Sequence, residues 1–298
     1  MTTNGFVIGQ RSSEVMHVLH PRLRYPNLWR GCVGAWAPCL GPGGLILQDN
    51  SGRGSATLTN MELSDWVKEE GQYSLDYDGS NEYTLIGNVP QLTFERTDSF
   101  SCAARIYLDT TAPVASTILG KSNAGGGTPG WVFHCFRRAS LNSTAIGVQL
   151  INGSSNLIEL NSGAATIAAG QLYHVAFTYA GTSTAAGVRL YINGVPQTAT
   201  VVTDTLSATI VGTNGALIGG RHSTAPTQFL NGRIGEVQVW NRALAESEVR
   251  LHSRRQGIAY EIAPRRSYMA AVAGGITGPL ISGKLSRQAS LTGGRLVQ

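Results

Sequence analysis

The acidic residues are the first candidates for chemistry, and their spacing argues against catalysis. Hydrolysis of a glycosidic bond needs two carboxyl groups that flank the bond at a defined separation. Asp76 and Asp78 would share one face of a strand, because side chains alternate along it, but Glu82 lies beyond the turn at Gly79. Acids at such positions are typical turn formers. We therefore expect no catalytic pair, and a glycoside hydrolase is the least favoured function.

Nucleophilic and thiol chemistry are not indicated either. The chain has no Gly-x-Ser-x-Gly sequence, the mark of a nucleophile elbow. His174 lies within an alternating apolar stretch, where a histidine is usually packed or hydrogen-bonded. Cys32 and Cys39 do not have the spacing of metal ligands, and Cys102 and Cys135 fall at apolar positions of predicted strands. We expect the latter two to be free, buried thiols.

The elements that must position any site are predicted to be short strands joined by tight turns. Glycine is abundant, at 37 residues, and charged residues make up only 14% of the chain, a profile typical of all-β proteins. Residues 172–179 and 188–192 alternate with period two, and Asn193-Gly194 supplies the positive φ angles of a hairpin turn. Residues 100–108 alternate as well. One helix is expected, over residues 241–252.

Three motifs give the chain a family resemblance. A Trp-bearing strand over residues 28–36 leads into an Asp-x-Ser-Gly-x-Gly turn at 49–54, and residues 73–79 read Tyr-Ser-Leu-Asp-Tyr-Asp-Gly. Residues 229–240 then run Phe-Leu-Asn-Gly-Arg-Ile-Gly-Glu-Val-Gln-Val-Trp. Together these segments resemble the laminin-G-like, concanavalin-A-like sandwich over about residues 30–253, which implies an all-β jelly roll. Because this fold carries lectins, glycosidases and structural proteins alike, function has to be argued from a site.

The resemblance leaves a segment at each end, so we predict an N-terminal arm over residues 1–29, a sandwich over 30–253 and a C-terminal arm over 254–298. Residues 1–30 and 250–298 together hold 12 basic and 2 acidic residues. These ends carry a net charge of +10 and the remainder −5, within a total of +5. Basic ends on an acidic body indicate an acidic partner, such as a neighbouring copy. The arginines expected to contact neighbours are Arg22, Arg24, Arg254, Arg255, Arg265 and Arg266.

A calcium site is what the resemblance implies for chemistry. Laminin-G-like domains often bind calcium at a rim of the sandwich, and their usual closing motif is Gly-x-Ile-Asp-Glu. This chain reads Gly232-Arg-Ile-Gly235-Glu236, so one expected carboxylate is missing. Calcium needs several oxygen ligands, and the candidate set is Asp49, Asp78 and Glu236. We expect no cofactor, with calcium at this set as the open alternative to a Glu236 that bonds backbone or pairs with an arginine.

Glycan binding would need an exposed aromatic ring with polar groups beside it. Trp131, which follows a glycine-rich loop, and His222, in an Arg-His-Ser-Thr-Ala-Pro loop, are the candidates. Trp131 also begins an alternating strand, so packing in the core competes with this role. The remaining tryptophans are expected in the core, because large aromatic side chains dominate burial: Trp29, Trp36, Trp66 and Trp240.

The whole-chain pattern is similar to laminin-G-like proteins encoded by bacteriophages, where such proteins are virion components. This resemblance implies a non-enzymatic virion structural protein, first of all a capsid decoration protein, whose arms bind other virion proteins in a homo-oligomer. The alternative is an adhesin on a tail or fibre that binds host-surface glycans.

The remaining partner classes are less favoured. The basic arms are not continuous tracts of basic residues, which argues against nucleic acid. The first residues show no charged start followed by an apolar core, and no apolar run is long enough to span a bilayer. We therefore expect a protein made in a host cytoplasm without a secretory signal, present in the virion and without a membrane partner.

Overall fold

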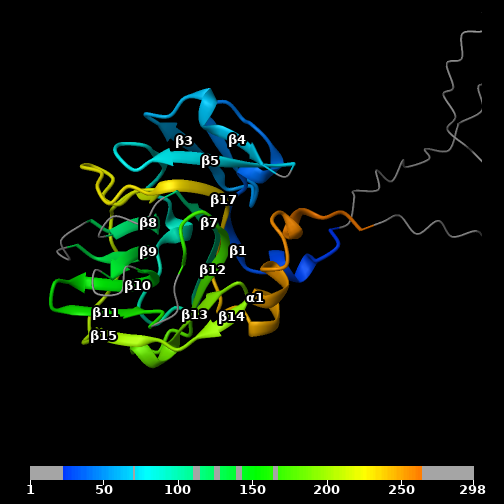
Figure 1. The fold of residues 1–298 in the computed structure, drawn as a ribbon. Coiled ribbons are helices and arrows are strands. Elements are labelled where there is room, and N and C mark those ends of the chain that lie inside the picture. The colour runs from blue at the N-terminus through cyan, green and yellow to red at the C-terminus, as the bar shows by residue number, and fades with distance from the viewer. Residues whose placement is uncertain are drawn as a thin grey trace, which may run out of the picture. The chain divides into compact units, whose positions relative to one another are not determined.

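The strands pair in antiparallel fashion throughout the described part of the chain and form two layers (Figure 1). The computed structural model describes residues 23–69, 71–109, 115–123, 128–138, 143–163 and 167–263. An all-β, concanavalin A-like sandwich was predicted from the alternation of the strands, and this prediction is confirmed.

The first layer runs from β4 to β14, and β1 lies beside the second half of β17. Its strands, in spatial order, are β4 (Trp66–Glu69), β5 (Gln72–Asp78), β17 (Asn231–Trp240), β7 (Phe100–Leu108), β12 (Leu172–Tyr179), β13 (Val188–Ile192) and β14 (Val195–Gln197), with β1 (Cys32–Trp36).

The second layer continues from β1 through a single pairing of Trp36 with Asp49. Its strands, in spatial order, are β2 (Ile46–Asp49), β3 (Gly54–Thr59), β6 (Tyr83–Gly87), β16 (Ala216–Ile218), β8 (Ala115–Gly120), β9 (Gly130–Arg138), β10 (Ser143–Gly153), β11 (Asn156–Asn161) and β15 (Thr200–Asp204).

The main core fills the space between the layers with alternate residues of both. In β7, Cys102, Ala104, Ile106 and Leu108 face this core, whereas Ala103 belongs to a separate apolar cluster on the other face of the strand. A strand that is covered on both faces is apolar almost throughout, which explains the nearly continuous burial of β7. The cysteines of the chain are all free thiols, as expected for Cys102 and Cys135.

The turn predicted at Asn193-Gly194 joins β13 to β14. Asn193 has a φ of 51° and Gly194 a φ of 77°, the positive pair that a two-residue hairpin requires. A side chain at Gly194 would also overlap the Oγ atom of Ser253. The sequence signal was therefore sufficient here, because the turn is specified by its own two residues.

The outer face of the first layer is partly covered by α1 (Glu246–His252). Leu244 and Val249 pack there on Ala103, Ala176 and Tyr191. The helix begins later than the predicted start at residue 241. Its N-cap residue, Ala245, has no side-chain oxygen to cap the first turn, and only the Glu248 carboxylate accepts the Ala245 N–H at 3.0 Å.

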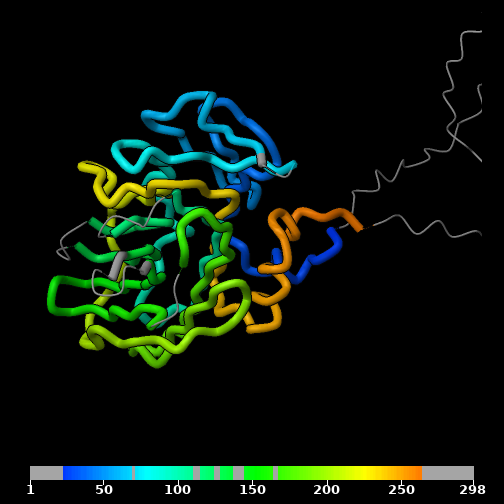
Figure 2. The backbone as a smooth tube through the Cα atoms, viewed as in Figure 1, coloured from blue at the N-terminus to red at the C-terminus, as the bar shows by residue number. Residues whose placement is uncertain are grey.

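The first and last described segments lie side by side against this layer (Figure 2). Leu23 bridges Ile262, and the backbone N–H of Arg24 donates to the carbonyl of Glu261 at 2.6 Å. Trp29 is only half-buried, not a core residue, and its ring meets the edge of Tyr260 at 5.2 Å. The division into arms and sandwich stays a prediction.

Trp36, Trp66 and Trp240 are buried, as predicted.

Within the residues described, no helix has the length and apolar character needed to cross a membrane.

Candidate functional site

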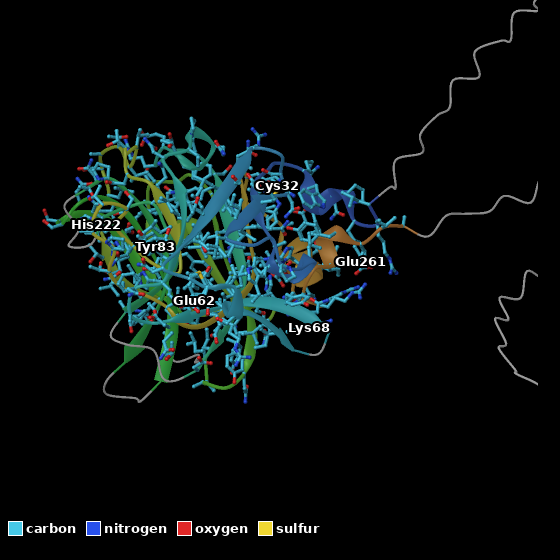
Figure 3. The ribbon with its side chains drawn as sticks, turned by 90° about the horizontal axis from the view of Figure 1, so that it is seen from above. Cys32, Glu62, Lys68, Tyr83, His222 and Glu261 are labelled. Carbon is cyan, nitrogen blue, oxygen red and sulfur yellow. The ribbon has the colours of Figure 1, made fainter. Side chains whose placement is uncertain are left out.

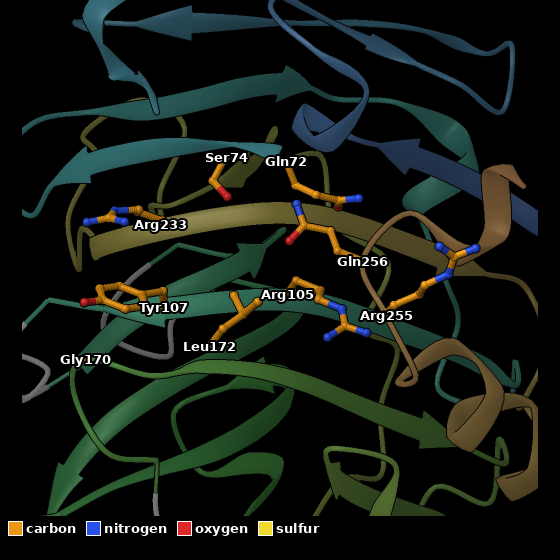
Figure 4. Close-up of a pocket in the computed structure, with 9 residues that line it drawn as sticks. All are labelled: Gln72, Ser74, Arg105, Tyr107, Gly170, Leu172, Arg233, Arg255 and Gln256. Atoms are coloured by element: carbon orange, nitrogen blue, oxygen red, sulfur yellow. The ribbon is translucent and has the colours of Figure 1, made fainter. Parts of the chain in front are cut away.

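A cavity of about 750 Å³ opens on the outer face of the first layer, beside the area that α1 covers (Figure 4). We call it the arginine cavity. Strands β5, β17, β7 and β12 supply its floor, and the segment after α1 supplies one wall. Its lining residues are Gln72, Ser74, Arg105, Tyr107, Gly170, Leu172, Arg233, Arg255 and Gln256.

Strand alternation explains why polar side chains gather on this face. Arg105 and Tyr107 alternate with the core residues of β7, and Gln72 and Ser74 alternate with those of β5. In β17 the register shifts between Ile234 and Glu236, so that Glu236 lies directly across from Arg105. The bulge thus places the Glu236 carboxylate beneath the cavity.

Arg105 is held in place from two sides. Its Nε atom lies 3.5 Å from Oε1 of Glu236, and its Nη2 donates to the carbonyl of Ser253 at 2.7 Å. Both side chains are more than nine-tenths buried. The other carboxylate oxygen of Glu236 accepts the N–H of Gly257 at 3.1 Å. Burial raises the pKa of Glu236 to about 7, against the opposing effect of the Arg105 charge.

Gly235, which stands where the laminin-G-like motif Gly-x-Ile-Asp-Glu has its Asp, has a packing role here. Gly235 leaves room for the side chain of Gln256, which a Cβ at this position would overlap. Gln256 in turn donates from Nε2 to the carbonyl of Tyr73 at 3.0 Å. The glycine therefore lets the segment after α1 close against β5 and β17.

The other two arginines of the cavity are also oriented by neighbours. The Arg233 guanidinium lies over the Tyr107 ring, 4.6 Å from its centroid, and 3.8 and 3.9 Å from the carboxylates of Asp76 and Asp109. Arg255 donates from Nε to Glu261 at 2.7 Å. Together these contacts fix where the two guanidinium groups stand at the edge of the cavity.

Glu261 also joins the two terminal segments. Its second carboxylate oxygen lies 3.1 Å from Nη1 of Arg24, so one carboxylate pairs with two of the arginines predicted for assembly. Arg254 is exposed, and the remaining three, Arg22, Arg265 and Arg266, lie outside the described residues.

A neutral histidine pair joins β12 to the last residue of α1, next to Arg105. His174 Nε2 and His252 Nδ1 are 2.9 Å apart, and His252 Nε2 bonds the Gln238 side-chain oxygen. Because that oxygen only accepts, His252 carries its proton on Nε2 and accepts at Nδ1 from His174. Burial lowers the pKa of His252 to about 3 and holds that of His174 well below its ordinary value. His174 is therefore a packed, hydrogen-bonded residue, as expected.

The predicted calcium ligands are not brought together. Asp49 caps a turn by accepting the N–H groups of Ala35 and Ser51 at 2.8 and 2.9 Å, and Asp78 accepts that of Ser80 at 2.7 Å. Glu236 is buried against Arg105, five residues along β17 from the partner of Asp78. No group of three metal-ligating side chains exists among the residues described. The prediction of calcium at Asp49, Asp78 and Glu236 is therefore wrong for this conformation.

Trp131 is the core residue that its strand position favoured, and not a sugar platform. Its side chain is 1% exposed, packs in tilted and edge-on contacts with Phe94, Phe100 and Phe177, and donates from Nε1 to the carbonyl of Leu92 at 3.0 Å. An aromatic ring without an exposed face cannot stack on a sugar.

His222 does not line the arginine cavity. It lies at the end of the molecule opposite Glu261 (Figure 3). Its Nδ1 accepts the N–H of Ala225 at 2.9 Å within a turn. A glycan-binding role for His222 stays a prediction.

The arginine cavity was missed because its residues come from distant parts of the chain. One signal was available: Arg105 and Tyr107 are the large polar members of a strand that is otherwise apolar or small. Nothing local indicated that Arg233 and Arg255 would join them, since this depends on the β17 bulge and on the path after α1.

Comparisons with known proteins agree with the observed fold. A family model described as the concanavalin A-like lectin/glucanases superfamily matches residues 66–250. No curated protein matches the chain significantly.

Two solved structures show the extent of the structural similarity. Trypanosoma rangeli sialidase in complex with sialic acid has a TM-score of 0.51 and 17% identity over 78% of this chain, which spans only 33% of the sialidase chain. The binding domain of Paraclostridial Mosquitocidal Protein 1 has a TM-score of 0.54 and 12% identity, covering 76% of this chain and 52% of that one. At such identities the likeness concerns the fold alone.

Proposed function

Since this chain belongs to the concanavalin A-like lectin/glucanases superfamily, we propose that it is a non-enzymatic glycan-binding module whose site is the arginine cavity. One observation carries the proposal: a cavity of about 750 Å³ is lined by guanidinium, amide and hydroxyl groups. These groups donate hydrogen bonds to the oxygen atoms that cover a sugar. The volume suits a small ligand or a short stretch of an oligosaccharide.

The same lining argues against hydrolysis. Cleavage of a glycosidic bond needs a carboxylic acid to protonate the leaving oxygen and usually a second carboxylate across the site. The described residues that line the cavity include neither Asp nor Glu. A tyrosine nucleophile at Tyr107 would need a base to accept its proton, and the carboxylates of Asp76 and Asp109 pair with Arg233 instead. We therefore propose binding without turnover.

A glycan array probed with the full chain tests this function. We expect binding to at least one oligosaccharide class, weakened by Gln72→Ala, which shortens an exposed side chain of the cavity. His222→Ala serves as the matched control at the other candidate location and should leave binding intact. Loss of binding in His222→Ala alone would move the site to that loop. Release of reducing sugar from a bound glycan would overturn the non-enzymatic assignment.

The paired terminal segments favour a second, compatible function. We infer that the protein is a virion structural component, first of all a capsid decoration protein, whose ends attach it to neighbouring copies or other virion proteins. Leu23 and Ile262 pair, so the chain beyond each of them starts from one place on the sandwich. Residues 1–22 and 264–298 hold seven basic residues and one acidic residue, and this net charge of +6 suits an acidic partner surface. Glycan binding by the sandwich would make such a protein an adhesin on a tail or fibre.

Truncation tests this assembly role. Removal of residues 1–22 and 264–298 spares the Arg24–Glu261 pair and the segments that pack on the sandwich. We expect the trimmed protein to keep its melting temperature and to lose self-association in light scattering, whereas the full chain forms a defined oligomer. A trimmed protein that assembles as well as the full chain would refute the role of the ends.

A further inference from the structure

We propose that the arginine cavity selects saccharides that carry a negative charge, either a carboxylate or a sulfate ester. This inference rests on the proposed glycan binding and names the ligand class of the same site. It follows from the charge of the cavity wall, from the arrangement of its guanidinium groups, and from its single aromatic side chain, Tyr107, whose ring is covered on one face by Arg233.

The wall of the cavity presents positive charge only. Among the described residues that line it, three are arginines and none is acidic. The carboxylates that pair with these arginines are not among the lining residues: Glu236 is fully buried beneath Arg105, Glu261 lies among the terminal segments, and Asp76 and Asp109 contact Arg233. A ligand in the cavity therefore meets three cationic side chains and no carboxylate in the lining itself, which favours an anion over a neutral sugar.

The guanidinium groups stand at two ends of the cavity (Figure 4). Arg233 and Tyr107 lie at one end and Arg105 and Arg255 at the other, with Gln256 between them. Gln72 and Ser74 line the β5 side. This order suits a saccharide whose acidic group meets one pair of cations while its hydroxyl groups bond the amides and the serine hydroxyl.

All three arginines have partners without a ligand, and that of Arg255 is the Glu261 carboxylate. Arg105 is fixed by Glu236 and by the carbonyl of Ser253, and Arg233 lies on the ring of Tyr107. A ligand that bonds such groups loses less conformational entropy, because these long side chains are already ordered. Each contact therefore contributes more to the affinity.

The lining favours an acidic sugar over a single-stranded nucleic acid. Nucleic acid would require aromatic faces on which successive bases can stack. Tyr107 is the one aromatic side chain among the described lining residues, and the guanidinium of Arg233 covers a face of its ring. The polyanion is therefore expected to be a saccharide, and a nucleic acid becomes an outcome that the experiment can reveal.

Calorimetric titration of the full chain tests the proposal with probes of defined charge. The acidic probes are 3′-sialyllactose and tetragalacturonate for carboxylates and a chondroitin sulfate tetrasaccharide for sulfate. Lactose and maltotetraose are the neutral probes, and a ten-residue oligothymidylate represents nucleic acid. We expect at least one acidic saccharide to bind about tenfold tighter than the neutral ones, with an affinity that falls as salt increases. The arm that binds identifies the acid.

Single substitutions then assign the effect to the cavity. Arg255→Gln and Arg233→Gln should each weaken the acidic saccharide about tenfold, the loss expected for one charge-assisted hydrogen bond, and leave neutral saccharides within about twofold. Arg189→Gln is the matched control, because Arg189 is exposed on β13 and does not line the cavity. It should change neither affinity. Melting temperatures of all three variants show that each is folded.

Each contrary result has its own meaning. Equal affinity of the wild-type protein for neutral and acidic saccharides would overturn charge selection and leave glycan binding standing. Failure to bind any saccharide would overturn both proposals. Tighter binding of oligothymidylate than of any acidic saccharide would assign the cavity to nucleic acid. If Arg189→Gln lost as much affinity for the acidic saccharide as Arg255→Gln, the protein's net charge alone would explain the effect, and the proposed site would be refuted.

Discussion

The buried pair His174 and His252 should make the protein sensitive to acid, and His252→Gln should remove a defined part of that sensitivity. Burial lowers the pKa of His252 to about 3, while an unfolded histidine titrates near pH 6.5. Below pH 6.5 the unfolded chain therefore binds a proton that the folded chain does not. The stability linked to this group is present above pH 6.5 and is lost as the pH falls towards 3.

The magnitude follows from the difference between the two pKa values. Each pH unit below 6.5 costs about 1.36 kcal/mol per buried histidine, so His252 alone removes about 2 kcal/mol of unfolding free energy between pH 7 and pH 5. Glu236 acts in the opposite direction, because its raised pKa of about 7 lets the folded state take up a proton first. The informative quantity is therefore the difference between variant and wild type, in which Glu236 cancels.

Urea unfolding of wild type, His252→Gln and the surface control Arg189→Gln at pH 7 and pH 5 measures that difference. At pH 7 the variant should be less stable by about 1–3 kcal/mol, because the hydrogen bonds of His252 are lost. On going to pH 5 it should lose about 2 kcal/mol less than the wild type, whereas Arg189→Gln should lose as much as the wild type. Equal losses in variant and wild type would refute the neutral, buried state of His252.

Three further substitutions test other parts of the structure. Glu236→Gln leaves Arg105 buried without its charged partner and should lower the unfolding free energy by about 3 kcal/mol in urea titrations; an unchanged stability would mean that the pair is not buried. Trp131→Ala should cost about 3–5 kcal/mol by the same method, because it empties part of an aromatic core, and a stable variant with altered sugar affinity would restore Trp131 as a surface residue. Gly235→Asp should lower the melting temperature, because the new side chain overlaps Gln256, at a cost of about 1–3 kcal/mol. Added calcium should leave that temperature unchanged, and recovery by calcium would revive the metal site.

The fold was largely predictable because its signals are local. Alternation in residues 100–108 and 172–179 places successive side chains on opposite faces, and β7 and β12 follow within those limits. The turn at Asn193-Gly194 is specified by its own two residues. The helix start was misplaced because residues 241–245 continue the chain from β17 before the first helical turn, and Ala245 gives no capping signal.

The candidate sites were harder to predict because they depend on what covers each face. Trp131 follows a glycine-rich stretch that resembles a binding loop, but the opposing layer buries its ring. Asp49 has the residue type of a calcium ligand, yet its oxygens serve the adjacent turn and the backbone of β1. Residue type alone does not distinguish a ligand from a capping group.

The arginine cavity, in contrast, was not predicted at all, because its residues are brought together only by the fold. Arg105, Arg233 and Arg255 come from separate parts of the sequence and line one cavity only because of a bulge in β17 and the return of the chain after α1. Arg255 was predicted as a contact for neighbouring subunits, since a basic terminal segment has no sequence feature that separates an assembly role from a role in a site.

The most direct test of the central claim is a crystal structure of the full chain with an acidic oligosaccharide that binds in titration. The account predicts ligand density between Arg233 and Arg255, with the acidic group hydrogen-bonded to at least one guanidinium of the cavity. Density beside His222, or an empty cavity at a saturating concentration of a ligand bound elsewhere, would contradict it.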